Sequence, residues 1–222
     1  MMLGRPLVGG HTSEGAELVL GLSLTGLADP DRVLRKRGLR AGDRLVLTKG
    51  LGTGTLFAAE MRMRAKGRWV DGAIAAMRQS SRAAADVLRR HGTTACTDVT
   101  GFGLLGHLVE MTRASSVDVG LELVTVPVLE GALDTLSAGL TSSLHPANLR
   151  LRRAVANVDR VGADPRYLLL YDPQTAGGLL AGVPSDRANA CVEALREQGY
   201  EQATIIGTVE SRGDGDAPIH LV

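Results

Sequence analysis

The fold is constrained most strongly by residues 95–107, which read Ala-Cys-Thr-Asp-Val-Thr-Gly-Phe-Gly-Leu-Leu-Gly-His. Apolar residues before Asp98 predict a strand, and leucines at helical spacing after Gly103 predict a helix. Gly101 and Gly103 allow a sharp turn between the two, and a close approach of the backbone to a ligand. The stretch therefore predicts a strand–turn–helix unit, in which the carboxylate of Asp98 stands at the end of a strand beside a helix N-terminus.

Asp98 has two open interpretations. A carboxylate beside free backbone amides suits a phosphate-bound hard cation, because the carboxylate binds the metal and the amides bind phosphate oxygens. The other interpretation is a glycine-rich turn with a solvated or capping aspartate, since short glycine motifs often bind nothing. Cys96 shares a strand face with Asp98, but no base lies near it in the sequence, so we interpret it as a small core residue. We interpret His107 as a core or surface residue.

Composition excludes several classes of protein. The 222 residues include one Trp, two Phe and three Tyr, so the core must be built from Leu, Val, Ala and Ile. The net charge is +1, with acidic and basic residues mixed along the chain. Nucleic-acid-binding proteins carry a one-sided basic surface, so no nucleic-acid partner is expected. No apolar run approaches the roughly 20 residues of a membrane helix, so no membrane partner is expected. Cys96 and Cys191 lie far apart and outside any CxxC, which favours a reducing compartment and a cytoplasmic location.

Strands and helices are predicted to alternate loosely along the chain. Strands are predicted at residues 17–26, 43–49, 94–97, 117–124, 179–183, 203–209 and 219–222. Helices are predicted at residues 55–64, 71–90, 104–111, 129–138 and 186–198. Residues 27–42 read as a connection, residues 139–150 as a polar loop and residues 151–166 as irregular. This pattern predicts an α+β fold with a mixed sheet covered by helices.

Two further glycine motifs are candidates for phosphate contacts. In Gly9-Gly10-His11-Thr12, the glycines permit close approach, while His11 and Thr12 can donate to phosphate or ribose oxygens. A surface loop is the other interpretation of this motif. The glycine-rich turn at residues 50–54 is neither a P-loop nor a dinucleotide fingerprint. Lys49 before it reads either as a phosphate contact or as a surface lysine at a strand end.

The motifs taken together resemble one family over essentially the whole chain. They are residues 9–12, residues 47–54, the Asp98 motif at residues 97–107, and the Asp-Pro-Gln-Thr-Ala-Gly-Gly-Leu-Leu motif at residues 172–180. This set closely resembles selenophosphate synthetase (selenide, water dikinase). The Asp98 motif sets that family apart from the related aminoimidazole ribonucleotide synthetases and thiamine monophosphate kinases. Ala176 is a small departure, because the family usually has serine there.

The resemblance carries expectations about fold and site. It implies that residues 1–42 are the tail of an N-terminal ATP-binding domain plus a linker. Residues 43–222 are then a C-terminal α+β domain of the aminoimidazole ribonucleotide synthetase-like fold. It implies that Asp98 is a Mg²⁺ ligand, and that an ATP site shared across a homodimer includes Gly9, Gly10, His11 and Thr12. The family's catalytic cysteine or selenocysteine, a lysine and further aspartates belong to the N-terminal domain, so no nucleophile is assigned here.

The expected activity is the formation of selenophosphate, AMP and phosphate from ATP, selenide and water. One aspartate supplies one ligand to one Mg²⁺, whereas several carboxylates are needed to hold more than one metal around a triphosphate. Activity of this chain alone is therefore left open. The alternatives are a non-catalytic nucleotide-binding or interaction domain, and another ATP-dependent kinase or synthetase of the same superfamily.

Overall fold

The computed structural model describes residues 8–17, 19–30, 33–160 and 164–222. The chain divides into two units, residues 1–33 and residues 34–222, and each is described by itself. The described residues of the first unit contain no β-strand. The strand predicted at residues 17–26 is therefore wrong, although position 18 lies outside the described residues.

The first unit has a strand-like sequence without strand pairing. Leu20, Leu22 and Leu24 alternate with smaller residues, as in a strand, yet each is more than three-quarters exposed. A strand forms when its backbone groups pair with a neighbouring strand, and the described residues of this unit form no such pair with one another. Alternation alone was therefore insufficient to predict the structure. Positions 31 and 32 of the predicted connection lie outside the described residues.

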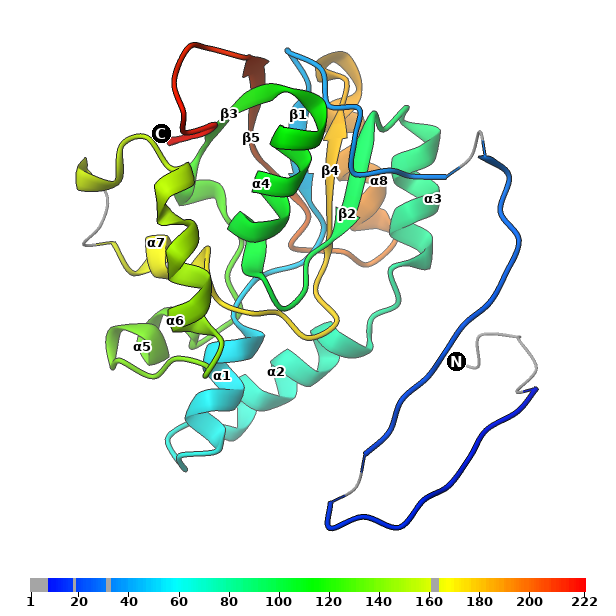
Figure 1. Ribbon diagram of the computed structural model, residues 1–222, viewed down its shortest axis with the longest axis vertical. Helices are drawn as coiled ribbons and strands as arrows, with labels where there is room; N and C mark the ends of the chain where they lie inside the picture. Colours follow the sequence, from blue (N-terminus) through cyan, green and yellow to red (C-terminus); the bar gives the residue numbers. More distant parts are fainter. Residues whose placement is uncertain (1–7, 18, 31–32, 161–163) are drawn as a thin grey trace. The chain divides into compact units, whose positions relative to one another are not determined.

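The second unit is built on one mixed sheet (Figure 1). Its strands are β1 (Arg44–Leu47), β2 (Ala95–Asp98), β3 (Val117–Leu121), β4 (Leu179–Val183), β5 (Thr204–Ser211) and β6 (Ile219–Leu221). They lie in the order β2-β4-β1-β5-β3-β6. Strands β3 and β6 are parallel, and the other neighbours are antiparallel. The predicted α+β class and mixed sheet are confirmed.

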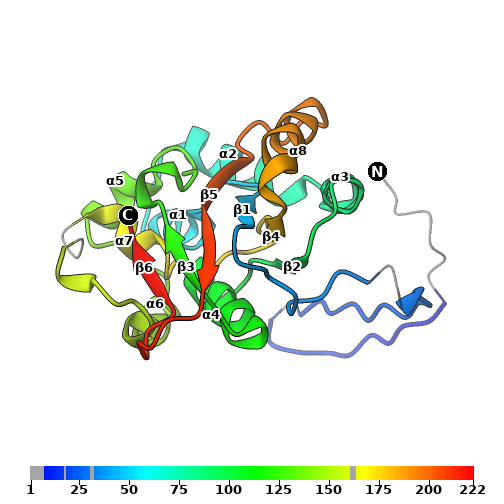
Figure 2. The same cartoon turned by 90° about the horizontal axis from the view of Figure 1, so that it is seen from above.

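Helices cover both faces of this sheet. They are α1 (Thr53–Glu60), α2 (Gly67–Arg78), α3 (Arg82–Arg90), α4 (Gly103–Ser115), α5 (Ala132–Ser137), α6 (His145–Asn148), α7 (Pro165–Leu169) and α8 (Ser185–Glu197). Short 3₁₀ turns occur at Leu123–Thr125, Leu149–Ala154 and Val158–Arg160. Seen from above, α4 lies on one face of the sheet, and α3 and α8 lie on the other (Figure 2).

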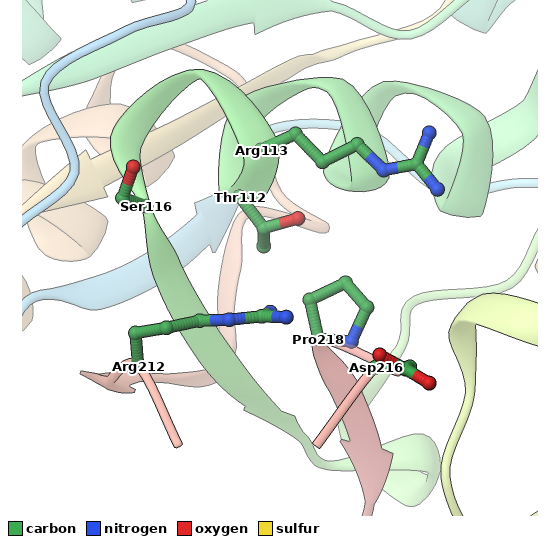
Figure 3. Close-up of a pocket in the computed structure, with 6 residues that line it drawn as sticks. All are labelled: Thr112, Arg113, Ser116, Arg212, Asp216 and Pro218. Carbon is green, nitrogen blue, oxygen red and sulfur yellow. The ribbon is translucent and has the colours of Figure 1, made fainter. Parts of the chain in front are cut away.

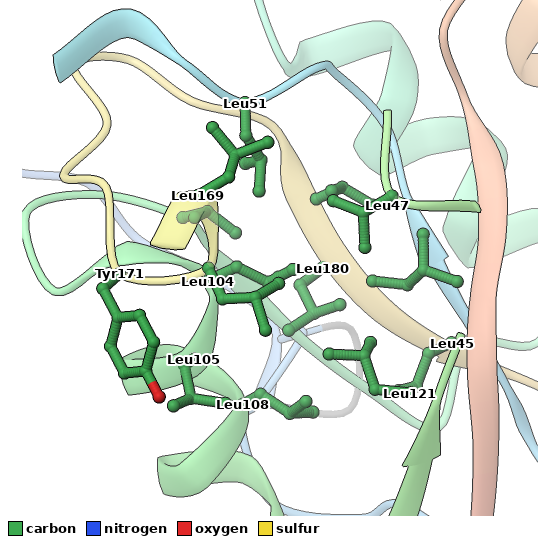
Figure 4. Packing of buried hydrophobic residues seen from close by; sticks show 14 of the residues in the cluster. Leu45, Leu47, Leu51, Leu104, Leu105, Leu108, Leu121, Leu169, Tyr171 and Leu180 are labelled. Carbon is green, nitrogen blue, oxygen red and sulfur yellow. The ribbon is translucent and has the colours of Figure 1, made fainter. Parts of the chain in front are cut away.

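The two faces of the sheet have separate cores. Along β1, Leu45 and Leu47 point into the larger core, whereas Val46 points into the smaller core under α3 and α8. The larger core is mainly leucine, with Tyr171 as an aromatic member (Figure 4). Because both faces are covered there, the central strands β1 and β4 are buried along most of their length and carry mainly apolar side chains.

The single helix predicted at residues 71–90 is wrong, because it is two helices, α2 and α3. The chain turns at Gln79, whose backbone is extended with ψ of 115°. The Nζ of Lys49 donates to the carbonyls of Ala76 (3.0 Å) and Gln79 (2.7 Å) at the end of α2. The Tyr200 hydroxyl accepts from the Ala84 amide (3.0 Å) in the first turn of α3. Distant residues therefore hold both sides of the break, next to a local bond from the Arg82 amide to the Ser80 hydroxyl (3.3 Å).

The loop predicted at residues 139–150 is also wrong in part, because it contains α6. Helix α7 lies where the sequence predicted irregular structure followed by an apolar run. Its start carries a recognisable signal, since Asp164 caps the helix by accepting from the Arg166 amide (2.8 Å) and Pro165 occupies its first turn.

Candidate functional site

The end of β2 carries Asp98 at the margin of a cavity. Asp98 is the last residue of the strand and is exposed, whereas the three strand residues before it are buried. β2 is an edge strand, and residues near position 35 lie beside it, because the Cys96 amide donates to the Arg35 carbonyl (2.7 Å). The resulting cavity of about 350 Å³ is lined by Leu34, Lys36, Ala85, Cys96, Thr97, Asp98 and Leu179.

The turn between Asp98 and α4 is held by distant segments. The Thr100 carbonyl accepts from the amides of Gly103 (3.0 Å) and Gln174 (3.0 Å). The side-chain amide of Asn148 donates to the carbonyls of Gly101 (2.9 Å) and Tyr171 (3.0 Å). The strand end therefore presents Asp98 from a fixed backbone.

The two glycines of the turn differ. Gly103 has φ of +70°, and a Cβ there would lie 2.8 Å from the Leu170 carbonyl oxygen. Gly103 is therefore required for the turn and for packing against the protein backbone. A Cβ on Gly101 would meet no atom within 4 Å, so its glycine character is not needed for packing.

Two amides at the start of α4 are already engaged. The Gly103 amide donates to Thr100, and the Leu105 amide donates to the Leu170 carbonyl (3.0 Å). These two donors are satisfied by the protein, so they do not provide the free anion site expected at this helix N-terminus. The chemistry of the site rests on the exposed carboxylate.

A charged cluster that the sequence analysis missed lies beside the turn. His107 is buried, and its Nε2 lies 3.0 Å from the Thr100 amide nitrogen. Its Nδ1 lies 3.7 Å from Glu110 Oε2, which accepts from the Nζ of Lys36 (2.6 Å). His107 and Glu110 are three residues apart on one helix face, which was a readable signal. Lys36 stands in a basic segment and gave no distinguishing signal.

The thiol of Cys96 is unsuited to nucleophilic attack. Burial, and then the negative charge of Asp98, raise the pKa of Cys96 to about 12. The thiol is therefore protonated near neutral pH, and the protonated form is a poor nucleophile. Cys96 and Cys191 are both free and buried. The interpretation of Cys96 as a core residue agrees with this environment.

The glycine turn after β1 is closed by side chains from the motif at residues 172–180. The Gln174 Oε1 accepts from the amides of Gly52 (3.0 Å) and Thr53 (3.2 Å) and from the Thr53 hydroxyl (3.2 Å). The Asp172 Oδ2 accepts from the Gly54 amide (3.0 Å). The first amides of α1 are thus capped from a distant part of the chain, which leaves them engaged with protein atoms.

Asp172 and Lys49 are buried ionisable residues that contact this closed turn and the motif at residues 172–180. Asp172 is 0% exposed, and burial raises its pKa to about 7, against the opposing effect of its hydrogen bond from Gln174. Its Oδ1 has no hydrogen-bond partner within the described part of the chain. The Nζ of Lys49 donates to a third carbonyl, that of Ala176 (3.1 Å), and burial lowers the pKa of Lys49. Lys49 is therefore a buried residue whose amino group links three backbone carbonyls. It is not the surface lysine that one interpretation expected.

A separate cavity of about 300 Å³ lies at the end of α4. It is lined by Thr112, Arg113, Ser116, Arg212, Asp216 and Pro218 (Figure 3). The Arg212 Nη1 donates to Asp118 Oδ1 (2.7 Å), so the charge of this arginine is balanced by a neighbour. The residues of the sequence motifs do not line this cavity, and we do not assign the site to it.

The predicted ATP-binding residues belong to the first unit. Gly9, Gly10, His11 and Thr12 are all exposed, and a Cβ on either glycine would meet no atom within 4 Å. Their role in binding ATP stays a prediction.

Asp98 is the one carboxylate among the residues that line the cavity at the end of β2. Among residues 8–17, 19–30, 33–160 and 164–222, no group of three His, Cys, Asp or Glu side chains is placed to hold a metal. Mg²⁺ at phosphate sites is commonly held by one or two carboxylates, with phosphate oxygens and water completing its shell. Asp98 can supply one such carboxylate. None of the helices formed by the described residues combines the length and the hydropathy that a membrane span needs.

Comparisons with known proteins agree with this architecture. Residues 40–220 match the family described as AIR synthase related protein, C-terminal domain. The chain is 39% identical over 209 residues to a selenide, water dikinase of Geobacter metallireducens, covering 94% of this chain and 61% of the relative. It is 40% identical over 211 residues to a selenide, water dikinase of Trichlorobacter lovleyi, covering 94% and 60%. The chain thus spans about 60% of the length of these relatives.

A solved structure shares the fold at lower sequence identity. It is the hydrogenase maturation protein HypE in complex with ATP, with a TM-score of 0.56 and 20% identity. The match covers 86% of this chain and 50% of that one. This likeness agrees with the α+β fold expected from the resemblance.

Proposed function

The chain belongs to the AIR synthase related protein family through its C-terminal domain, and from this premise we propose that it acts as the C-terminal domain of a selenide, water dikinase. The support is the 39% and 40% identity to two proteins of that name. The whole reaction would form selenophosphate, AMP and phosphate from ATP, selenide and water. The boundary near residue 42 between an ATP-binding tail and this domain is part of the proposal.

Asp98 is proposed to bind the Mg²⁺ that accompanies ATP. The observation that carries this proposal is the exposed carboxylate at the end of a buried strand, beside a cavity of about 350 Å³. A bound Mg²⁺ would neutralise negative charge on the phosphates. The chain's own contribution is to orient that carboxylate, because the Thr100 carbonyl and the Asn148 side chain fix the backbone of the turn after it.

The remaining parts of the proposal concern ATP, selenide and assembly. Gly9, Gly10, His11 and Thr12 are proposed to contact ATP in a homodimer that also handles selenide. A HypE structure is described as a complex with ATP, and it shares the fold of this chain. The cytoplasmic location is also proposed, because two buried free thiols suit a reducing compartment.

A second candidate is a domain that binds nucleotide without catalysis. It is favoured by one observation: among the residues that line the cavity at the end of β2, Asp98 supplies the sole carboxylate. A third candidate, another ATP-dependent kinase or synthetase of the family, is less favoured. The identity to the selenide, water dikinases is about twice the 20% identity to HypE.

A calorimetric titration tests the metal role of Asp98. The full chain is titrated with ATP in the presence of Mg²⁺, and again with the metal chelated. We expect Asp98→Ala to weaken the Mg²⁺-dependent affinity about tenfold or more, because one charged ligand is lost. The matched control is Asp71→Ala, which removes an exposed carboxylate at a different place, on α2. It should leave the affinity unchanged. Equal affinity of Asp98→Ala and the wild type would contradict the assignment.

An activity assay separates the three candidates. The chain is mixed with the N-terminal part of the Geobacter metallireducens relative, and AMP release is measured with and without selenide. Selenide-dependent release supports the dikinase. Nucleotide binding without release under any condition supports the non-catalytic domain, and ATP consumption that ignores selenide supports another kinase or synthetase.

A further inference from the structure

We propose that His107 is a positioning residue, which holds the turn carrying Asp98 by accepting a hydrogen bond from the Thr100 amide. The carboxylate of Glu110, which is paired with Lys36, favours the tautomer that this bond requires. The link to ligand binding rests on the proposed function, because it takes Asp98 as the Mg²⁺ ligand. The hydrogen bond itself is independent of that function.

The contacts of Nε2 determine its state. The Thr100 amide nitrogen lies 3.0 Å from Nε2 and carries a hydrogen, so it is the donor. Nε2 must therefore be the unprotonated nitrogen, and the proton of a neutral ring is on Nδ1. The Thr100 hydroxyl lies 3.1 Å from the same nitrogen and can also donate to it. The backbone thus dictates the tautomer.

The opposite side of the ring faces a negative charge. Nδ1 has no hydrogen-bond partner within the described part of the chain, but it lies 3.7 Å from Glu110 Oε2. That oxygen is held by the Nζ of Lys36 at 2.6 Å. A carboxylate near Nδ1 favours a proton there, which leaves Nε2 free to accept.

His107 is enclosed in a way that keeps the ring neutral. Its side chain is buried, and the Phe102 ring lies 6.0 Å away between centroids. Burial lowers the pKa of His107, with Glu110 and Asp98 acting in the opposite direction and Lys36 acting with the burial. A neutral ring keeps its acceptor nitrogen, and a charged ring would lose it.

The cluster connects the cavity to the turn. Lys36 lines the same cavity as Asp98, and Thr100 is only two residues beyond Asp98. A chain of contacts therefore runs from the cavity wall through Glu110 and His107 to the backbone that follows the carboxylate. Losing the bond at Thr100 removes one of the contacts that hold this backbone, while those of Gln174 and Asn148 remain.

Two other histidines provide internal references. Nε2 of His145 lies 3.0 Å from the Leu168 carbonyl, so that nitrogen must be protonated, the reverse of His107. Nδ1 of His91 lies 2.9 Å from the Val87 carbonyl and must also be protonated. The chain has five histidines, so their ring signals can be separated in one spectrum.

The first test is the ¹⁵N NMR spectrum of the histidine rings in the full-length wild-type chain near pH 7.5. We expect His107 to be protonated at Nδ1 and unprotonated at Nε2, whereas His145 is protonated at Nε2. A His107 ring protonated at Nε2 would overturn the proposal. This measurement requires no variant, so it cannot fail through misfolding.

The second test compares His107→Gln with His107→Asn by hydrogen exchange at the Thr100 amide. Glutamine places an acceptor oxygen near the position of Nε2, whereas asparagine is too short to reach it. We expect exchange to be about tenfold or more faster in His107→Asn and close to wild type in His107→Gln. Unchanged exchange in both variants, or equally fast exchange in both, would overturn the acceptor role.

The third measurement links the bond to Asp98 through the affinity for ATP with Mg²⁺. We expect His107→Asn to weaken the metal-dependent affinity several-fold, and His107→Gln to restore it. If the wild type shows no metal-dependent binding, the proposed function fails, and the ring spectrum and Thr100 exchange still decide the positioning bond. If His107→Asn exchanges faster but binds like the wild type, the link to Asp98 is overturned.

Discussion

Two strand-to-helix turns of this domain have similar sequences and opposite environments. The turn from β1 into α1 and the turn from β2 into α4 both follow buried strands and both contain glycines. In the first, the carboxylate at the turn is Asp172, supplied from 118 residues away in the chain and fully buried. In the second, the carboxylate is Asp98, which belongs to the turn itself and is exposed.

The difference shows what decides whether a glycine turn is open to a ligand. The α1 amides are engaged by Gln174 and Asp172, so the turn after β1 contributes to stability. The turn after β2 keeps an exposed carboxylate beside a cavity. Local sequence provides the turn in both cases, and tertiary contacts decide whether its polar groups are already paired.

The largest expected effect on the free energy of unfolding is at the turn from β1 into α1, whose amides are bonded to Gln174 and Asp172. Gln174→Leu removes the acceptor for two amides and one hydroxyl in a buried site. Each buried donor left unpaired costs about 1–3 kcal/mol, so we expect a loss of about 3 kcal/mol or more in the free energy of unfolding. Gln198→Leu, at an exposed position after α8, is the matched control and should change it by less than about 0.5 kcal/mol. Urea denaturation measures both, and equal effects would contradict the capping role of Gln174.

The next effect compares two glycines within the turn after β2. Gly103→Ala is expected to destabilise by about 2 kcal/mol or more, because of the positive φ and the contact with the Leu170 carbonyl. Gly101→Ala has open space and should change stability by less than about 0.5 kcal/mol. Thermal or urea unfolding of the pair is decisive, and a larger effect at Gly101 would contradict the geometry of the turn.

The third effect is a pH dependence from the buried Asp172. Its pKa is about 7 in the folded state and 3.8 in its ordinary state, so between these values the folded chain holds one more proton. The stability linked to this retained proton is fully present below about pH 4 and is lost as the pH rises through about 7. In that window this group lowers the free energy of unfolding by about 1.4 kcal/mol per pH unit.

The variant Asp172→Asn isolates this contribution. Asparagine keeps an acceptor for the Gly54 amide but does not titrate, so the difference between wild type and variant should slope across pH 4–7. Urea unfolding at several pH values measures this difference. A flat difference would show that Asp172 has an ordinary pKa in the folded state.

The smallest effect on stability is expected at the open turn. Asp98→Asn should change the free energy of unfolding by less than about 0.5 kcal/mol, because Asp98 is exposed. Chemical denaturation without metal measures it, beside Asp172→Asn. A destabilisation of about 2 kcal/mol would instead show that Asp98 has a structural role like that of Asp172.

The parts of the fold set by nearby residues were predictable from the sequence. Strand β2, its glycine turn and α4 follow from residues 95–107, and the strand at β1 follows from its apolar run. The break between α2 and α3 was not predicted: Lys49 and Tyr200 contact its two sides from distant positions. Ser80, whose hydroxyl accepts from the Arg82 amide, was the local signal for it. The strand expected at residues 17–26 failed because alternation supplies a pattern and no pairing partner.

The site was predictable to a similar degree. Asp98 was singled out by its place at a strand end, and its role as a metal ligand stays a prediction. The motif at residues 172–180 was recognised, but its capping function depends on contacts across more than 100 residues of sequence. His107 was noted without its role, which depends on the Thr100 amide and on Glu110.

The most direct test of the contrast between the two turns follows both carboxyl carbons in one sample. The ¹³C signals of Asp98 and Asp172 are recorded while Mg²⁺ is titrated into the full chain with ATP present. We expect the Asp98 carboxyl signal to shift with Mg²⁺ and the Asp172 signal to stay in place. A shift at Asp172, or none at Asp98, would contradict the claim that the turn after β2 is the open one.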